Sequence, residues 1–214
     1  MKNLDINNLR ENYNLDHIDF SNVRKNPIDL FIDWFNFEKS NNYKDVNACV
    51  LSTVSSDNIP SSRVVLLKYL KNDKFIFFTN YDSNKGKEIS YNNNVCLNFF
   101  WVNSERQVRI NGKATKISED DSDDYFNARP IESQIGACVS SQSEIIDIAH
   151  DFTNDIEHFK LLHKNKKIKR PNHWGGYSII PHKIEFWQGR PSRLHDRLLY
   201  EKCKEDWIFK RLSA

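Results

Sequence analysis

The sequence predicts a mainly β protein of the α+β class: an antiparallel β-barrel with peripheral helices. Short segments rich in β-branched and aromatic residues follow one another closely, separated by polar turns. Helical segments are inserted among these strands and do not alternate with them, which argues against a doubly wound parallel sheet. The composition stays uniform along the 214 residues, so we expect one domain.

The first expected element is a helix that begins near residue 27. Asn26 and Pro27 are typical of a helix start, because Pro suits the first turn. Apolar residues then recur at helical spacing from Ile28 to Phe35. This pattern predicts a helix that runs to about Lys39.

A series of strands is expected next. Their residues are short apolar runs with many β-branched and aromatic side chains. Polar clusters such as Ser56-Asp57-Asn58 lie between them, as expected of turns and short loops. The predicted strands are residues 48–54, 62–70, 75–80, 95–101 and 106–117.

Two more helices and three more strands complete the pattern. Residues 119–127 are rich in acids at their start, and residues 143–164 place apolar side chains on one helical face. The basic stretch 164–170 is expected to be a solvated loop. Strand character returns at residues 175–180, 183–189 and 206–212.

Bulk properties exclude several classes of protein. Charged residues make up 28% and hydrophobic residues 39% of the chain, a balance typical of a folded protein and not of a disordered one. A net charge of +2 does not by itself indicate nucleic-acid binding. The four cysteines lack the spacing of a zinc site, so we expect reduced thiols and no metal. Without a signal peptide or a membrane span in the sequence, we expect a cytoplasmic protein.

Anion-binding side chains are the main chemical signal. The six glycines form neither a dinucleotide-binding motif nor a P-loop, so a phosphate would be held by side chains. Arginine offers a planar fork to phosphate oxygens, lysine a point charge, and Ser or Gln neutral hydrogen bonds. Such residues cluster in the segments RVVLLK, ERQVR, YFNARPIES and RLHDR.

Ordinary structural roles compete with binding roles at each position. Arg63 and Lys68 are five residues apart on a predicted strand and point to opposite faces, so one of them could be a solvated charge. A hydrolase triad from Ser192, His195 and Asp196 is disfavoured, because no nucleophile elbow is present. Packing or cross-strand pairing could equally account for Arg106, Arg109, Tyr125, Trp174 and Trp187.

Taken together and in order, these segments resemble the pyridoxamine 5′-phosphate oxidase family. The similarity runs from about Leu9 to the C-terminus. Each motif alone is weak, but the ordered set is specific. The motifs are SRVVLLK, FFTNYDSNKG, ERQVRINGKA, YFNARPIESQIGA, WGGY and EFWQGRPSRLHDR.

The resemblance implies a fold, an assembly and a reaction. The fold would be an FMN-binding split barrel, a Greek-key antiparallel barrel, with a lid segment at residues 1–25 and a single domain at 26–214. Two FMN sites would lie at the interface of a homodimer. The enzyme, a pyridoxal 5′-phosphate synthase, would oxidise pyridoxamine 5′-phosphate and pyridoxine 5′-phosphate with O₂. The products would be pyridoxal 5′-phosphate and H₂O₂, with NH₃ from the amine.

The resemblance also assigns roles to residues. Catalytic roles fall on Arg193 and His195. The implied FMN contacts are Arg63, Val64, Val65, Leu66, Leu67, Lys68, Phe78, Thr79, Asn84, Lys85, Gln107, Gln142, Ser143, Trp187 and Arg197. The implied substrate contacts are Arg10, Tyr13, Lys68, Tyr125, Arg129, Ser133, Arg193, Leu194 and His195.

Departures from the family pattern concern the cofactor more than the substrate. Asn84 stands where many relatives carry a basic residue, and Phe78 stands where Tyr is common, so we expect changes in affinity and not in reaction type. Two alternatives stay open. One is a non-catalytic split-barrel protein that binds flavin or pyridoxal phosphate, and the other is a nucleic-acid-binding β-barrel with aromatic strands.

Overall fold

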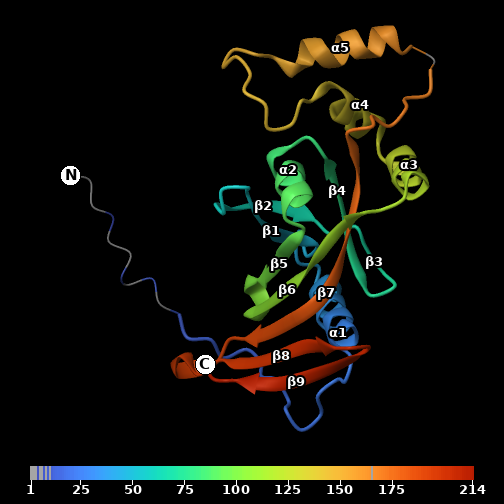
Figure 1. Ribbon diagram of the computed structural model, residues 1–214. Coiled ribbons are helices and arrows are strands. Elements are labelled where there is room, and N and C mark those ends of the chain that lie inside the picture. The colour runs from blue at the N-terminus through green and yellow to red at the C-terminus, as the bar shows by residue number, and fades with distance from the viewer. Residues whose placement is uncertain (1–3, 5–6, 8, 10, 165) are drawn as a thin grey trace. The chain divides into compact units, whose positions relative to one another are not determined.

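The computed structural model describes residues 4, 7, 9, 11–164 and 166–214 (Figure 1). The chain divides into two compact units. The first unit comprises residues 1–49, 97–111 and 182–214, and the second comprises residues 50–96 and 112–181. The predicted boundary between a lid segment and a domain at residue 26 stays a prediction.

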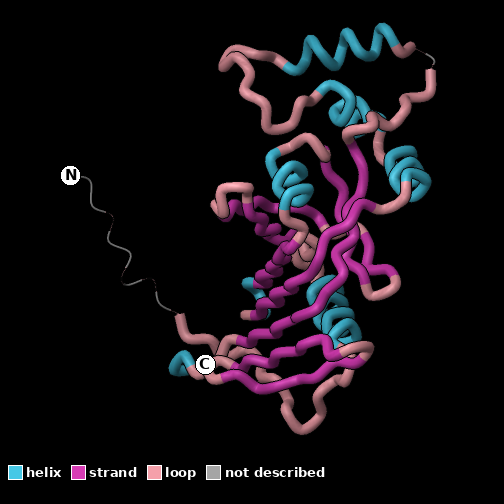
Figure 2. Tube along the Cα trace, in the orientation of Figure 1, coloured by secondary structure: helices cyan, strands magenta, loops and turns pink. Residues whose placement is uncertain are grey.

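Strands account for more of the described residues than helices do (Figure 2), and β3, β4, β7, β8 and β9 pair antiparallel in that order. Their order in the sheet is β2-β1-β5-β6-β7-β4-β3, and β8 pairs with β7 and with β9. The strands are β1 (Ala48–Val54), β2 (Pro60–Leu66), β3 (Tyr69–Lys71), β4 (Lys74–Asn80), β5 (Asn94–Trp101), β6 (Arg106–Lys116), β7 (Trp174–Gln188), β8 (Asp196–Cys203) and β9 (Asp206–Leu212).

Alternation of buried and accessible side chains explains the predicted strands. In β5, every second residue is buried, as expected where one face of a strand packs on a core. Strand β4 is buried on both faces, and its Phe77 stacks on Tyr177 of β7 with ring centroids 5.7 Å apart. The run predicted at residues 62–70 is divided in two, and Lys68 lies at the break between β2 and β3.

The helices begin where local capping predicts. The Asn26 side chain accepts a hydrogen bond from the backbone N–H of Ile28, and Pro27 occupies the first turn of α1, as expected. The helix predicted at residues 119–127 is confirmed as α3. The helices are α1 (Pro27–Ser40), α2 (Asn84–Tyr91), α3 (Glu119–Ala128), α4 (Ile131–Val139) and α5 (Phe152–Leu162), with short 3₁₀ turns at Val102–Ser104 and Pro191–Arg193.

The prediction of a helix from residue 143 is wrong for its first part. Helix α5 begins only at Phe152, where the Asp151 side chain accepts from the N–H of Thr153. Ile145 and Ile148 are fully exposed, so the apolar spacing that predicted a helix faces no core. Ser143 also adopts a positive φ of 78°, which a helix does not allow.

Three elements were not predicted from the sequence. Helices α2 and α4 are short, and β8 lies in a segment that had been interpreted for its chemistry alone. The two strands predicted at residues 175–180 and 183–189 form one strand, β7. None of the helices within the described residues is long and apolar enough to cross a membrane. None of the four cysteines, all of which are among the described residues, forms a disulfide with another.

Candidate active site

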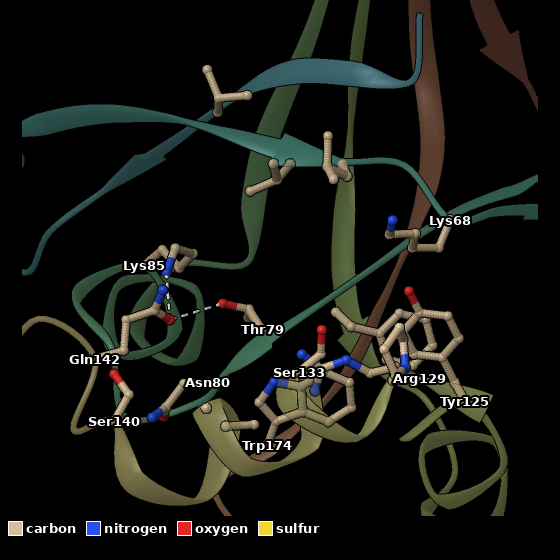
Figure 3. Close-up of a pocket in the computed structure, with 17 residues that line it drawn as sticks. Lys68, Thr79, Asn80, Lys85, Tyr125, Arg129, Ser133, Ser140, Gln142 and Trp174 are labelled. Atoms are coloured by element: carbon tan, nitrogen blue, oxygen red, sulfur yellow. Dashed lines mark hydrogen bonds between the residues drawn. The ribbon is translucent and has the colours of Figure 1, made fainter. Parts of the chain in front are cut away.

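A cavity of about 630 Å³ lies in the second unit (Figure 3). It is bordered by the end of β2, by β4, and by α2, α3 and α4 with the segment after α4. Many residues that the sequence assigned to cofactor or substrate lie on its wall. These are Val64, Val65, Leu66, Lys68, Phe78, Thr79, Lys85, Tyr125, Arg129, Ser133 and Gln142.

A buried cation marks one side of this cavity. Lys85 Nζ donates hydrogen bonds to Gln142 Oε1 at 3.1 Å and to Ser83 Oγ at 3.0 Å. The hydroxyl of Thr79 also contacts Gln142 Oε1, at 3.4 Å, so the three side chains converge as Figure 3 shows. Burial, helped by the nearby charge of Arg63, lowers the pKa of Lys85 to about 8. An anion bound here would stabilise the ammonium form of Lys85.

An aromatic stack and an arginine form the other side. The ring of Tyr125 stacks on Phe78 with centroids 3.8 Å apart, and the Arg129 guanidinium lies 4.5 Å from the ring centre of Trp174. Burial lowers the pKa of Arg129 and raises that of Tyr125. Nη1 of Arg129 is buried and donates to no atom of the described residues. A buried guanidinium donor without a partner is costly, so this side of the cavity is suited to an anionic ligand.

Arg63 does not line the cavity. Its guanidinium contacts Glu88 Oε2 at 3.1 Å, and Ser61 and Thr53 complete a polar network around that carboxylate. Burial raises the pKa of Glu88, but the hydrogen bonds of this network outweigh it and keep the pKa below its usual range. Asn84 is exposed at the start of α2, and neither Leu67, which is buried, nor Ser143 lines the cavity.

A second group of predicted residues lies in the first unit. The rings of Tyr13, Trp187 and His195 contact one another, with centroids 5.7 Å apart for Tyr13 and Trp187 and 4.6 Å for Trp187 and His195. Gly189 allows this contact, because an added Cβ would lie 2.7 Å from Cβ of Tyr13. Tyr13, Arg193 and His195 also border a cavity of about 690 Å³ in this unit. Arg10 lies outside the described residues.

His195 is held as a neutral imidazole. Its Nδ1 accepts a hydrogen bond from the backbone N–H of Arg190 at 3.1 Å. Burial and then the charge of Arg193 lower the pKa of His195. A neutral ring that accepts at Nδ1 carries its proton on Nε2, so Nε2–H is a hydrogen-bond donor.

Arg193 occupies a strained turn. Ser192 and Arg193 have φ values of 57° and 61°, the left-handed region that side chains other than glycine rarely adopt. The side chains of Arg193 and Leu194 are exposed. Such strain in a turn persists where the surrounding structure holds it, and it is concentrated at functional sites.

The other predicted residues of the first unit lie on strands. Arg197 Nε donates to Glu185 Oε1 at 2.9 Å, and Arg109 pairs with the other oxygen of the same buried carboxylate. Gln107 is half-buried on β6. Arg109 is therefore the partner of an acid on another strand, as the structural alternative expects, but this acid is buried and does not lie at the surface.

Sequence reasoning missed several side chains at these sites. Asn80, Ser140 and Trp174 line the cavity of the second unit. Trp174 is at the same time part of a core cluster, as predicted. In the first unit, Arg106 had been weighed both as an anion-binding residue and as a cross-strand partner, and its buried guanidinium binds Asp16 and Gln188. Only the tertiary structure reveals this pairing, because Asp16 lies 90 residues away in the sequence.

Comparison with known families covers both units. Residues 38–159 match the family model described as pyridoxamine 5′-phosphate oxidase. The chain belongs to the pyridoxamine 5′-phosphate oxidase family. Residues 174–214 match a second model, the pyridoxine 5′-phosphate oxidase C-terminal dimerisation region, which therefore contains Trp187, Arg193, His195 and Arg197.

Relatives in this family match over nearly the whole chain. The pyridoxine/pyridoxamine 5′-phosphate oxidase of Leptospira biflexa is 45% identical over 209 residues, 98% of this chain and 99% of that protein. The enzyme of the same name from Flavobacterium johnsoniae is 45% identical over 212 residues, with the same coverage of 98% and 99%.

Two solved structures have the same fold. The crystal structure of PhzG from Burkholderia lata 383, in complex with tetrahydrophenazine-1-carboxylic acid, has a TM-score of 0.85 and 26% identity, and covers 91% of this chain and 95% of its own. A pyridoxamine 5′-phosphate oxidase-related, FMN-binding protein from Nostoc punctiforme has a TM-score of 0.72 and 15% identity, covering 90% and 100%. The predicted split-barrel fold class is thus confirmed.

Proposed function

We propose that this family member is an oxidase that converts pyridoxamine 5′-phosphate and pyridoxine 5′-phosphate to pyridoxal 5′-phosphate. FMN is its cofactor and O₂ its electron acceptor. H₂O₂ is released, together with NH₃ when the substrate is the amine. Two relatives that are 45% identical to this chain are named for this activity, and each matches it over nearly the full length of both proteins. A cytoplasmic location stays a prediction.

The cavity of the second unit is the observation that carries this proposal. It holds two separate sets of anion-binding side chains, one around Lys85 and one around Arg129. A protein that only bound a flavin phosphate would need one such set. Two sets fit an enzyme that binds a phosphorylated cofactor and a phosphorylated substrate together.

The residues around Lys85 fit the phosphate of FMN. Lys85 is 8% exposed, and burying a cation in this way is favourable only when an anion or hydrogen-bond acceptors surround it. Thr79 and Gln142 add neutral hydrogen-bonding groups beside it. Bound FMN would supply the two-electron oxidation, in which a hydride leaves C4′ of the substrate and O₂ is the final acceptor. The protein supplies binding, orientation and exclusion of water.

The affinity for FMN should depend on pH because Lys85 loses its positive charge as the pH rises. Because the pKa of Lys85 in the protein without cofactor is about 8, its ammonium form predominates below that pH and is lost above it. We expect FMN affinity to be constant near pH 7 and to fall by up to about tenfold per pH unit above pH 8. Fluorescence titration of FMN from pH 7 to 9.5 measures this.

Two variants serve as controls for this pH dependence. Lys85→Gln should bind FMN more weakly at every pH and without the decline, and Lys85→Arg should stay charged throughout. A wild-type dissociation constant that does not change between pH 7 and 9.5 would contradict the role of Lys85.

The side chains around Arg129 fit the substrate phosphate. Lys68, Tyr125, Arg129 and Ser133 lie on this part of the wall, and Figure 3 shows the last three close to Trp174. Held by its phosphate, the substrate would present its pyridine ring to the flavin, so binding energy remote from C4′ fixes the reacting end. Arg193 would orient the ring, and the Nε2–H of His195 would donate a hydrogen bond beside it.

Lys68→Met is expected to raise the KM for pyridoxine 5′-phosphate. The change removes one charge-assisted phosphate contact of about 1.5 to 3 kcal/mol, which corresponds to about a 10- to 150-fold effect. The exposed side chain of Lys68 makes no ion pair within the described residues, so stability should hardly change. Steady-state kinetics and a thermal melt test both expectations, and an unchanged KM would rule out this role.

We further propose a homodimer with FMN at its interface. The matched dimerisation region contains Trp187, Arg193, His195 and Arg197, which belong to the first unit, whereas the phosphate-binding sets belong to the second. In a dimer, one protomer can complete the site of its partner with these side chains. Gln107 and Tyr13, which also lie in the first unit, would be contributed to the partner's site together with them.

A direct assay tests the function. The purified protein should be yellow, and addition of pyridoxamine 5′-phosphate should consume O₂ and produce pyridoxal 5′-phosphate and H₂O₂ in equal amounts. A yellow protein that binds the substrate without peroxide release would instead be the non-catalytic binding protein. A colourless protein that binds oligonucleotides with steep salt dependence would be the nucleic-acid-binding alternative.

A further inference from the structure

Arg170 lies in the basic stretch that the sequence predicts to be a solvated loop. Its side chain is only 5% exposed, and the neighbouring Ile168 packs in a core cluster with Phe126 and Trp174. The mechanism above gives Arg170 no role, and it does not line the cavity. A buried arginine in an otherwise solvated loop requires partners.

The guanidinium of Arg170 binds two carboxylates and two backbone carbonyls, the more distant carbonyl being that of Pro171, to which Nη1 donates at 3.4 Å. Nε donates to Asp123 Oδ1 at 2.5 Å, and Nη2 donates to the carboxylate of Glu119. Nη1 donates to the backbone carbonyl of Trp174 at 2.5 Å. Burial alone would lower the pKa of Arg170, but the bonds and charges of Asp123 and Glu119 outweigh it and raise the pKa.

These partners belong to elements that carry the phosphate site. Glu119 and Asp123 are four residues apart on α3, so they share one face of the helix. The same helix carries Tyr125 near its end, and Arg129 follows as its C-cap. Arg170 therefore holds α3 and the backbone of Trp174 through a single side chain.

Two of the proposed phosphate-binding residues, Tyr125 and Arg129, lie against the ring of Trp174. Tyr125 is parallel to it, with centroids 6.2 Å apart and an interplanar angle of 5°, and the Arg129 guanidinium lies 4.5 Å from its centre. A movement of α3 relative to Trp174 would change both contacts. Two buried residues of α3 also attach it there: the ring of Phe126 meets that of Trp174 edge-on with centroids 5.4 Å apart, and the Ser122 hydroxyl accepts from the N–H of Gly176 at 3.3 Å. The fork of Arg170 adds the charged contacts on the first turns of the helix.

We propose that Arg170 is a positioning residue for substrate phosphate recognition. It fixes α3 against Trp174, so that Arg129 and Tyr125 face the phosphate. A planar fork is suited to this task, since it binds two carboxylates and a carbonyl in one plane, which an ammonium group cannot do. The proposal rests on the proposed function, because it assigns the phosphate to this set.

The test compares Arg170→Met with the wild-type holoenzyme. A displacement of reacting or binding groups by about 1 Å can cost about 100-fold, so we expect the KM for pyridoxine 5′-phosphate to rise at least about tenfold. The kcat and the bound FMN should stay within about twofold of wild type, because the Lys85 set lies elsewhere in the cavity. Arg24→Met, which breaks an exposed arginine–aspartate pair, is the matched control and should leave KM unchanged.

Two more variants guard against a folding defect. Arg170→Lys should recover part of the lost affinity, because it keeps the charge without the fork. The double variant Glu119→Gln/Asp123→Asn should raise KM as well, and combining it with Arg170→Met should add little, as expected of groups that act together. Additive effects of the two changes would overturn the proposal.

Ligand binding separates this inference from the proposed function. The dissociation constants of pyridoxal 5′-phosphate and of pyridoxal are measured for wild type and Arg170→Met. Selective weakening of the phosphorylated ligand supports the role of Arg170 even if the wild-type protein shows no turnover, which would refute only the oxidase activity. Equal weakening of both ligands, or no change in either, overturns the positioning role.

Discussion

Replacement of Arg129 by Met is expected to lower kcat/KM for pyridoxine 5′-phosphate by about 100- to 1000-fold. The guanidinium can offer two charge-assisted hydrogen bonds to a phosphate, each worth about 1.5 to 3 kcal/mol, with some loss because they act together. Most of the effect should appear in KM, since the phosphate lies away from the reacting carbon. Initial rates of pyridoxal 5′-phosphate formation over a range of substrate concentrations measure it.

The stability of the Arg129→Met protein should not fall with its activity. In the free protein, Nη1 of Arg129 is buried without a hydrogen-bond partner among the described residues, and burial already lowers its pKa. Removing that group relieves an unfavourable burial, so the melting temperature should stay the same or rise. Arg129→Lys, which keeps the charge, should give an intermediate KM. A melting temperature far below wild type, with KM unchanged, would contradict this account of Arg129.

Arg193→Ala is expected to lower kcat about 100-fold or more while the flavin content stays near that of wild type. Loss of precise orientation over a reacting partner has effects of this size. Arg193 lies outside the Lys85 set, so FMN should remain bound. Turnover and the flavin absorbance of the same preparation give the two quantities.

Arg193→Gly is the matched control for backbone strain. Both variants lack the guanidinium, but glycine adopts the φ of 61° without strain and alanine does not. Equal activities of the two variants would assign the loss to the side chain. Near wild-type kcat/KM in Arg193→Ala would refute the orienting role.

Local sequence patterns correctly predicted the elements whose apolar side chains are buried in the structure. The alternation in β5 and the capping residues of α1 are examples, because both signals are complete within a few residues. The apolar spacing after residue 143 failed because Ile145 and Ile148 contact no core, and sequence alone does not tell whether an apolar face has a partner. Short helices such as α4 depend mainly on tertiary packing.

The candidate site was predicted by the order of its motifs and not by any single residue. Lys85 and Gln142 are 57 residues apart, and only the fold brings them within hydrogen-bond distance. The same reason hid the partners of Arg63 and Arg170, since Glu88 and Asp123 are ordinary surface acids in the sequence. Charged residues become interpretable when the structure shows which of them already have a partner.

The attachment of the N-terminal segment at Asp16 determines how far Tyr13 can travel. Arg106 holds the side chain of Asp16, Arg190 holds its carbonyl at 2.9 Å, and the N–H of Ile18 donates to Asp196. Two residues, Asn14 and Leu15, separate Tyr13 from this anchor, and these three steps along the chain span at most about 10 Å. The N–H of Leu15 also donates to Glu105 Oε2 at 3.1 Å, so Tyr13 could leave Trp187 and His195 only by displacement of the short stretch before Leu15. Ligand exchange would then require the displacement of a few residues, and the rest of the unit could stay folded.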